Sequence, residues 1–266
     1  MRSLGVSSAC FYPLTTEEAI RKTASMGAPC CEVFLNAFSE LDHAYLKRIK
    51  AFADSAEMRI CSLHPFSSFT ENYFLFSSYY RRFTDTLEQY KLFFEAASIL
   101  GASVFVIHGI LAAGTIGDEE YFERFAALME QGRRFGVHVC QENVVRHRSE
   151  DPAFLKKMGS FIGEDFGVVL DVKQARRAGY DPMVFAEQLG EKVAHVHLSD
   201  GDAARDCLPP GEGAFDFKRF FALLAAKGYT GDAVIELYET SFDSDCQIKN
   251  ALAFLKKTCG NYFRMI

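Results

Sequence analysis

The sequence predicts an α/β protein, a (β/α)8 barrel whose single domain spans residues 1–266. Three observations support this fold class. Short β-branched runs recur along the chain, segments with helical periodicity separate them, and a lone polar residue follows most of the runs. The gaps between these polar residues are 26 to 44 residues, about one strand, one helix and two loops each. The length of 266 residues also fits a barrel of this kind.

The expected strands follow one another in a regular order. The run LGVSSACF at 4–11 opens the chain, CCEVFL around Glu32 follows, and a third run ends at His64. The remaining five end at polar residues, namely ASVFVIH at 102–108, GVHVCQE at 136–142, GVVLD at 167–171, the run that ends at His197 and DAVIE at 232–236. Runs this apolar are typical of parallel strands buried on both faces.

The segments between the strands predict helices. A capping box from Thr15 to Glu18 begins the first. Another carries apolar residues at steps of four and three from Phe83 to Ala97, and Gly101 ends it. Further helices are expected from Asp118 to Gly136 and from Asp216 to Gly228.

A doubly wound open sheet would give a similar alternation, so the polar residues decide. An open sheet concentrates its chemistry at one switch point, whereas the strands of a closed barrel converge on one axis. At least six strands contribute polar ends here, which favours closure. No strand is followed at once by a glycine-rich phosphate loop.

Composition and charge limit the classes of function. The chain is 49% hydrophobic and 24% charged, as in ordinary globular domains, and we find neither a membrane span nor a secretory signal. The cysteines form no CxxC pair, and Cys10, Cys61 and Cys140 lie in expected strands, so we expect a cytoplasmic protein. A net charge of −6 without a basic stripe argues against a nucleic-acid partner.

The polar strand ends point to a metal. A carboxylate or imidazole is too costly to desolvate at the end of a buried strand unless it has a partner. The six residues concerned are His64, His108, Glu142, Asp171, His197 and Glu236. The stretch PFSSFTENYFLFSSYY at 65–80 follows His64 and holds seven aromatic residues, which suit a lid, a subunit contact or packing over the barrel rim.

The chain resembles the xylose isomerase-like TIM barrels, which include endonuclease IV, tagatose epimerase, hydroxypyruvate isomerase and inosose dehydratase. The resemblance covers nearly the whole chain and depends on the order of several motifs. These are SLHPF at 62–66, VIHG at 106–109, CQEN at 140–143, LDVKQARRAGYD at 170–181, HVHLSD at 195–200, PPGEGAFDF at 209–217 and VIELY at 234–238.

The resemblance to the sugar epimerases and isomerases implies one divalent metal held by Glu142, Asp171, His197 and Glu236. Three carboxylates and an imidazole favour Mn²⁺, with Mg²⁺, Co²⁺ and Zn²⁺ as alternatives. His195 is expected to support the site from deeper in the barrel. The resemblance also suggests a homodimer or homotetramer.

Endonuclease IV differs from this chain at its third zinc site. Gln174, Arg205 and Cys207 stand where its ligands would be, although His64, His108 and Glu142 would match its first site. Gln174 and Arg205 suit the hydroxyls of a sugar or an anionic group better than a metal. We therefore predict that Gln174, Arg205, His64, His108 and Glu32 bind substrate, with a second metal or a structural role as alternatives for the two histidines.

The expected activity is sugar isomerisation or epimerisation in carbohydrate metabolism, on a sugar, sugar phosphate or keto-polyol. A metal-stabilised enediolate would form when Glu142 or Glu236 removes a proton, and two bases on opposite faces would permit epimerisation. The alternatives are a lyase or dehydratase acting on a related polyol, a metal-dependent hydrolase of the endonuclease IV kind, and a noncatalytic sugar-binding relative.

Overall fold

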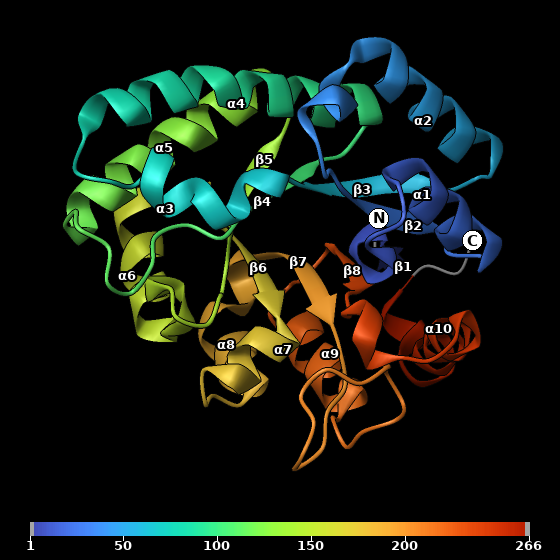
Figure 1. Ribbon diagram of the computed structural model, residues 1–266. Helices are drawn as coiled ribbons and strands as arrows, with labels where there is room; N and C mark the ends of the chain where they lie inside the picture. The colour runs from blue at the N-terminus through green and yellow to red at the C-terminus, as the bar shows by residue number, and fades with distance from the viewer. Residues whose placement is uncertain (1–2, 264–266) are drawn as a thin grey trace.

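The computed structural model describes residues 3–263, and their strands close into a parallel barrel in chain order, with β1 pairing to both β2 and β8 (Figure 1). This confirms the predicted fold class. The strands are β1 Leu4–Ser7, β2 Cys30–Phe34, β3 Arg59–His64, β4 Val104–Ile107, β5 His138–Glu142, β6 Gly167–Asp171, β7 Val193–Leu198 and β8 Asp232–Ile235.

Helices surround the barrel, with α4 and α5 packed side by side on one flank and α9 against α10 on another (Figure 1). Their bounds are α1 Thr16–Ser25, α2 His43–Ser55, α3 Glu71–Phe74, α4 Tyr80–Leu100, α5 Asp118–Arg134, α6 Pro152–Ile162, α7 Val172–Arg177, α8 Pro182–Leu189, α9 Phe217–Ala226 and α10 Asp245–Cys259. Phenylalanines dominate the layer between helices and strands; Phe94, Phe105, Phe122, Phe125 and Phe166 are all buried there.

Several helix ends form where the sequence predicts them. Thr15 and Glu18 make the capping box of α1, and Gly101 ends α4 in the left-handed conformation at φ +76°. The helices α6 and α8 each begin with a proline after an aspartate cap, Asp151 or Asp181.

Alternation along each strand places the site on the barrel axis. Val106, Cys140 and Val169 pack together in the interior. Two residues further on, His108 directly follows β4, and Glu142 and Asp171 end β5 and β6. Side chains two residues apart in a strand share one face. The polar residues therefore stack above the apolar interior, at the carboxyl ends of the strands where barrel active sites form.

Two segments differ from the expectations. The opening strand ends at Ser7, and residues 8–11, including Cys10, form a 3-10 helix in which the Ser7 hydroxyl accepts a hydrogen bond from Ala9 N. The connection after β6 holds two helices, α7 and α8. The aromatic stretch folds into a 3-10 turn, Phe66–Thr70, followed by the short α3. Between residues 3 and 263, no helix has the length and apolarity needed to span a membrane.

Candidate active site and metal centre

Glu142, Asp171, His197 and Glu236 converge at the carboxyl end of the barrel. One ligand atom from each lies within 4.8 Å of the others. His197 Nδ1 faces all three carboxylates, at 3.2 Å from Glu142 Oε1, 3.7 Å from Asp171 Oδ2 and 3.5 Å from Glu236 Oε2. Residues 94 positions apart in the chain thus form one compact set of oxygen and nitrogen donors.

Local structure fixes the orientation of Asp171. This residue ends β6 and also caps α7, because its Oδ1 accepts a hydrogen bond of 2.8 Å from Gln174 N. Its second oxygen, Oδ2, is thereby turned toward His197. The neighbouring Asn143 makes two hydrogen bonds to the backbone of Asp171, which hold the ends of β5 and β6 together.

The donor set fits a divalent cation. The oxygens Glu142 Oε2 and Asp171 Oδ2 are buried, and they face the cationic or imidazole groups of His108, at 3.0 Å, and Lys173, at 3.5 Å. Burying several carboxylates so close together costs free energy unless cations offset their charge. Three carboxylates with one imidazole are suitable ligands for Mn²⁺, Mg²⁺, Co²⁺ or Zn²⁺.

Beneath this set, Glu32 is fully buried and lies behind His197. Its Oε2 is 3.0 Å from His197 Nε2 and 3.3 Å from His195 Nε2, and hydroxyls of Ser7 and Ser62 donate to its carboxylate. A hydrogen bond from His197 Nε2 to Glu32 leaves Nδ1 directed at the other three carboxylates. Carboxylates commonly orient metal-binding histidines in this way.

His64 and His108 stand beside Glu142 and form a second cluster with it. Their Nε2 atoms are 3.1 Å apart, and His108 Nε2 is 3.0 Å from Glu142 Oε2. Because two lone pairs would repel at this distance, one imidazole must donate to the other in the absence of a shared ligand. The ring of His64 stacks on Phe34, with 4.7 Å between centroids.

Lys173 belongs to the site although the sequence reasoning missed it. Its side chain is 3% exposed, and its Nζ is 3.0 Å from Glu236 Oε2 and 3.5 Å from Asp171 Oδ2. The ammonium also lies 4.6 Å from the centre of the Tyr238 ring. The only available signal was its position two residues after Asp171, inside a motif already singled out.

The buried charges shift each other's pKa values. Burial opposes ionisation of Glu142, but His108 outweighs it and holds the pKa of Glu142 well below its usual range. Burial likewise opposes the charge of His197, yet Glu32 and Glu236 raise its pKa well above the usual value. Burial raises the pKa of Asp171 despite the nearby Lys173. The glutamates at the site are therefore ionised near neutral pH.

The other two predicted substrate-binding residues have protein partners. Gln174 Oε1 accepts a hydrogen bond of 3.2 Å from Val145 N, in the segment that follows β5. The Arg205 side chain is 62% exposed and pairs with Asp202 in the long connection after β7. In the described residues, neither side chain is part of the metal-ligand cluster.

The aromatic segment is attached to the rim beside His108. Glu71 is buried in α3, and its Oε2 accepts a 2.7 Å hydrogen bond from Gly109 N, just after β4. Burial raises the pKa of Glu71 to about 7. Phe69 in the same segment is 87% exposed, and its ring centroid lies 6.3 Å from that of His108.

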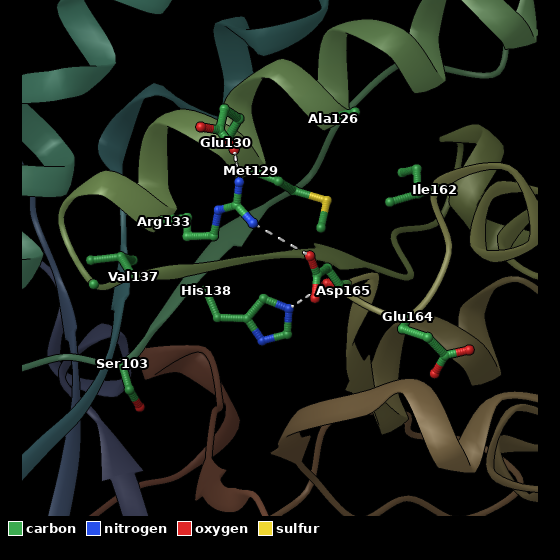
Figure 2. Close-up of a pocket in the computed structure, with 11 residues that line it drawn as sticks. Ser103, Ala126, Met129, Glu130, Arg133, Val137, His138, Ile162, Glu164 and Asp165 are labelled. Atoms are coloured by element: carbon green, nitrogen blue, oxygen red, sulfur yellow. Dashed lines mark hydrogen bonds and ion pairs between the residues drawn. The ribbon is translucent and has the colours of Figure 1, made fainter.

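A surface cavity of about 650 Å³ lies at the opposite end of the barrel, between α5 and the segment before β6 (Figure 2). Its lining includes His138, the first residue of β5, whereas Glu142 is the last. The polar groups there bind one another: His138 Nε2 lies 2.9 Å from Asp165 O, and Arg133 pairs with Glu130 (Figure 2). The amino-terminal face of such barrels serves stability.

The fold and the cluster define a (β/α)8 barrel with a candidate metal site of carboxylates and histidine at the carboxyl end of its strands. The family comparison identifies it further. The chain belongs to the xylose isomerase-like TIM barrel family, whose model matches residues 20–258.

Relatives and solved structures agree with this assignment. Fructoselysine 3-epimerase of Shigella flexneri is 24% identical over 238 residues, which cover 84% of this chain and 86% of the relative. The crystal structure of a D-tagatose 3-epimerase-like protein has a TM-score of 0.81 at 22% identity and covers 98% of both chains. The structure of the IolI protein, solved with a zinc atom, has a TM-score of 0.80 at 16% identity and covers 99% of this chain and all of the other. These structural likenesses show a shared fold.

Proposed function

We propose that the protein is a divalent-metal-dependent sugar epimerase or isomerase. The observation that carries the proposal is the clustering of three carboxylates and His197 within 4.8 Å at the catalytic end of the barrel. The family assignment and the epimerase relatives support the same reaction class. The substrate would be a sugar, sugar phosphate or keto-polyol with a carbonyl beside a hydroxyl.

In this scheme Glu142, Asp171, His197 and Glu236 hold the ion. When bound, a divalent ion would supply Lewis-acid stabilisation of negative charge on the substrate oxygens. Glu142 ends β5 and Glu236 follows β8, so the two carboxylates reach the axis from well-separated strands. Both have lowered pKa values, despite the opposing effect of burial, so each is ionised and able to accept the proton from carbon.

Two bases on different sides of the substrate would allow epimerisation, since one removes a proton and the other returns it to the opposite face. One glutamate acting on adjacent carbons would give isomerisation. We assign His64, His108 and Gln174 to hydrogen bonds with substrate hydroxyls. Arg205 would also bind substrate if its guanidinium left Asp202 and donated hydrogen bonds to a substrate oxygen instead. Glu32, with all its partners inside the protein, is assigned to orienting His197 instead.

The decisive experiment is hydrogen exchange at carbon. Protein loaded with Mn²⁺ is incubated in D₂O with a panel of ketohexoses and ketopentoses, and NMR follows deuterium at the carbons beside the carbonyl. We expect exchange with at least one ketose, and none after removal of the metal by a chelator. The same protein loaded with Zn²⁺ should not cleave DNA at abasic sites. Cleavage without carbon exchange would replace this proposal with the hydrolase alternative.

A further inference from the structure

Lys173 is a buried cation among residues that are assigned to hold another cation. Its ammonium contacts Glu236 Oε2 and Asp171 Oδ2, the same two oxygens that face His197 Nδ1. A lysine side chain with 3% exposure needs such partners, because burying an unpaired ammonium costs several kcal/mol. The ammonium therefore competes for the oxygens that a metal ion would use.

The surroundings hold Lys173 in place. The ring of Tyr238 lies over its ammonium at 4.6 Å, and Arg177 Nη1 donates a 2.7 Å hydrogen bond to the Tyr238 hydroxyl. Arg177 is itself paired with Asp206. Tyr238 is 45% exposed, whereas the Lys173 side chain beside its ring is buried. Lys173 thus has two carboxylates on one side and an aromatic ring on another.

The net charge of the three carboxylates suggests a role for a lysine at this position. Glu142, Asp171 and Glu236 contribute three negative charges, and Lys173 offsets one of them. With Lys173 present, a divalent ion would bring the net charge of this set to zero. Without Lys173, the same ion would leave one negative charge. An enediolate carries negative charge, so it would meet less repulsion in the neutral set.

We propose that Lys173 is a fixed positive charge of the site, which weakens binding of the divalent ion and in return stabilises the anion formed when the substrate loses its proton. The second half of this inference rests on the proposed function, whereas the first half concerns metal binding alone. The two halves predict opposite effects of removing the charge, a pattern that a purely structural lysine would not produce.

The test compares K173M with wild type and with K157M, a matched control that removes the ammonium of an exposed ion pair with Asp118. Titration calorimetry with Mn²⁺ needs no substrate. We expect K173M to bind Mn²⁺ at least about tenfold more tightly than wild type, because two cations no longer share the oxygens. K157M should bind as wild type does. Equal or weaker binding by K173M would overturn the inference.

At saturating Mn²⁺, we expect K173M to lower the rate of carbon deuteration at least about tenfold with little change in KM. An undiminished rate would overturn the catalytic half. If K173M fails to fold, K173R provides a second test, because arginine keeps the positive charge. The affinity of K173R for Mn²⁺ should stay within about threefold of that of wild type. A tenfold gain in its affinity would overturn the inference. Absence of exchange by wild type with every ketose would refute the proposed function, and the titration would still decide the role of Lys173 in metal binding.

Discussion

At the scale of single residues, the site consists of side chains that each serve two neighbours. Asp171 caps a helix with one oxygen and faces the cluster with the other. His197 contacts Glu32 through one ring nitrogen and the three carboxylates through the other. Such sharing fixes the orientation of the side chains without an ion, and pre-organised ligands would lose less entropy if one bound.

The first prediction concerns Glu32. E32Q keeps the size of the side chain but weakens the hydrogen bond that directs His197 Nδ1 toward the cluster. Loss of such an outer partner typically lowers metal affinity 10- to 100-fold, and we expect a loss in that range by Mn²⁺ titration. S7A is the matched control, because it removes a different hydrogen bond to the same carboxylate. Equal losses in both variants would argue against an orienting role.

The second prediction separates bases from ligands. E142Q and E236Q retain one oxygen ligand but cannot accept a proton, so at saturating Mn²⁺ we expect both to lose at least about a hundredfold in turnover. D171N should recover part of its activity when Mn²⁺ is raised, because its main defect is metal binding. Near-normal turnover of either glutamine variant at a high Mn²⁺ concentration would mean that the glutamate binds the metal but does not act as a base.

At the scale of elements, one buried carboxyl is among the groups that attach the aromatic segment to the barrel. Glu71 in α3 anchors the segment to Gly109, and burial raises its pKa from the ordinary 4.5 to about 7. A carboxyl whose pKa is raised on folding stabilises the folded state fully at pH values below its pKa in the unfolded chain. This stabilisation is lost as the pH rises through the pKa of the folded state. The free energy of unfolding should therefore fall as the pH rises from about 4.5 to 7.

The third prediction follows from that sign. E71Q has no titratable group at this position, so its stability lacks this pH dependence. The free energy of unfolding of E71Q minus that of wild type should therefore rise by up to about 3 kcal/mol from pH 4.5 to pH 8. Urea denaturation at both pH values measures the difference. E164Q changes a fully exposed carboxylate and should show no such trend. A parallel pH dependence of E71Q and wild type would contradict the assignment.

The elements also show how far sequence reasoning reaches. The polar ends of β3 to β8 could be predicted, because desolvation makes such residues conspicuous after apolar runs. Lys173 could not, since a lysine in a basic helical motif ordinarily faces water, and its burial depends on Glu236 and Tyr238 from another strand end. The 3-10 turn at 8–11 was missed because a serine cap interrupts an otherwise strand-like run.

At the scale of the whole molecule, metal binding should stabilise the fold. The proposed ligands come from β5, β6, β7 and the end of β8, so an ion bound there would join half of the barrel. An ion at a hundred times its Kd adds about 2.7 kcal/mol to the free energy of unfolding. For a chain of this size we expect Mn²⁺ to raise Tm by about 5 °C or more, measured by calorimetry. D171N should show a much smaller shift, and an equal one would place the ion elsewhere.

Closure of the barrel has a further consequence for how the protein is made. Pairing of Leu4 with Ala233 joins segments from opposite ends of the chain, and Glu236 follows immediately. A growing polypeptide on the ribosome therefore exposes the unpaired edges of its first and latest strands until β8 has emerged. Open parallel edges invite aggregation, so chaperone protection during synthesis should matter more for this protein than for one built from local hairpins. The carboxylate and histidine cluster, which includes Glu236, is consequently among the last features to form.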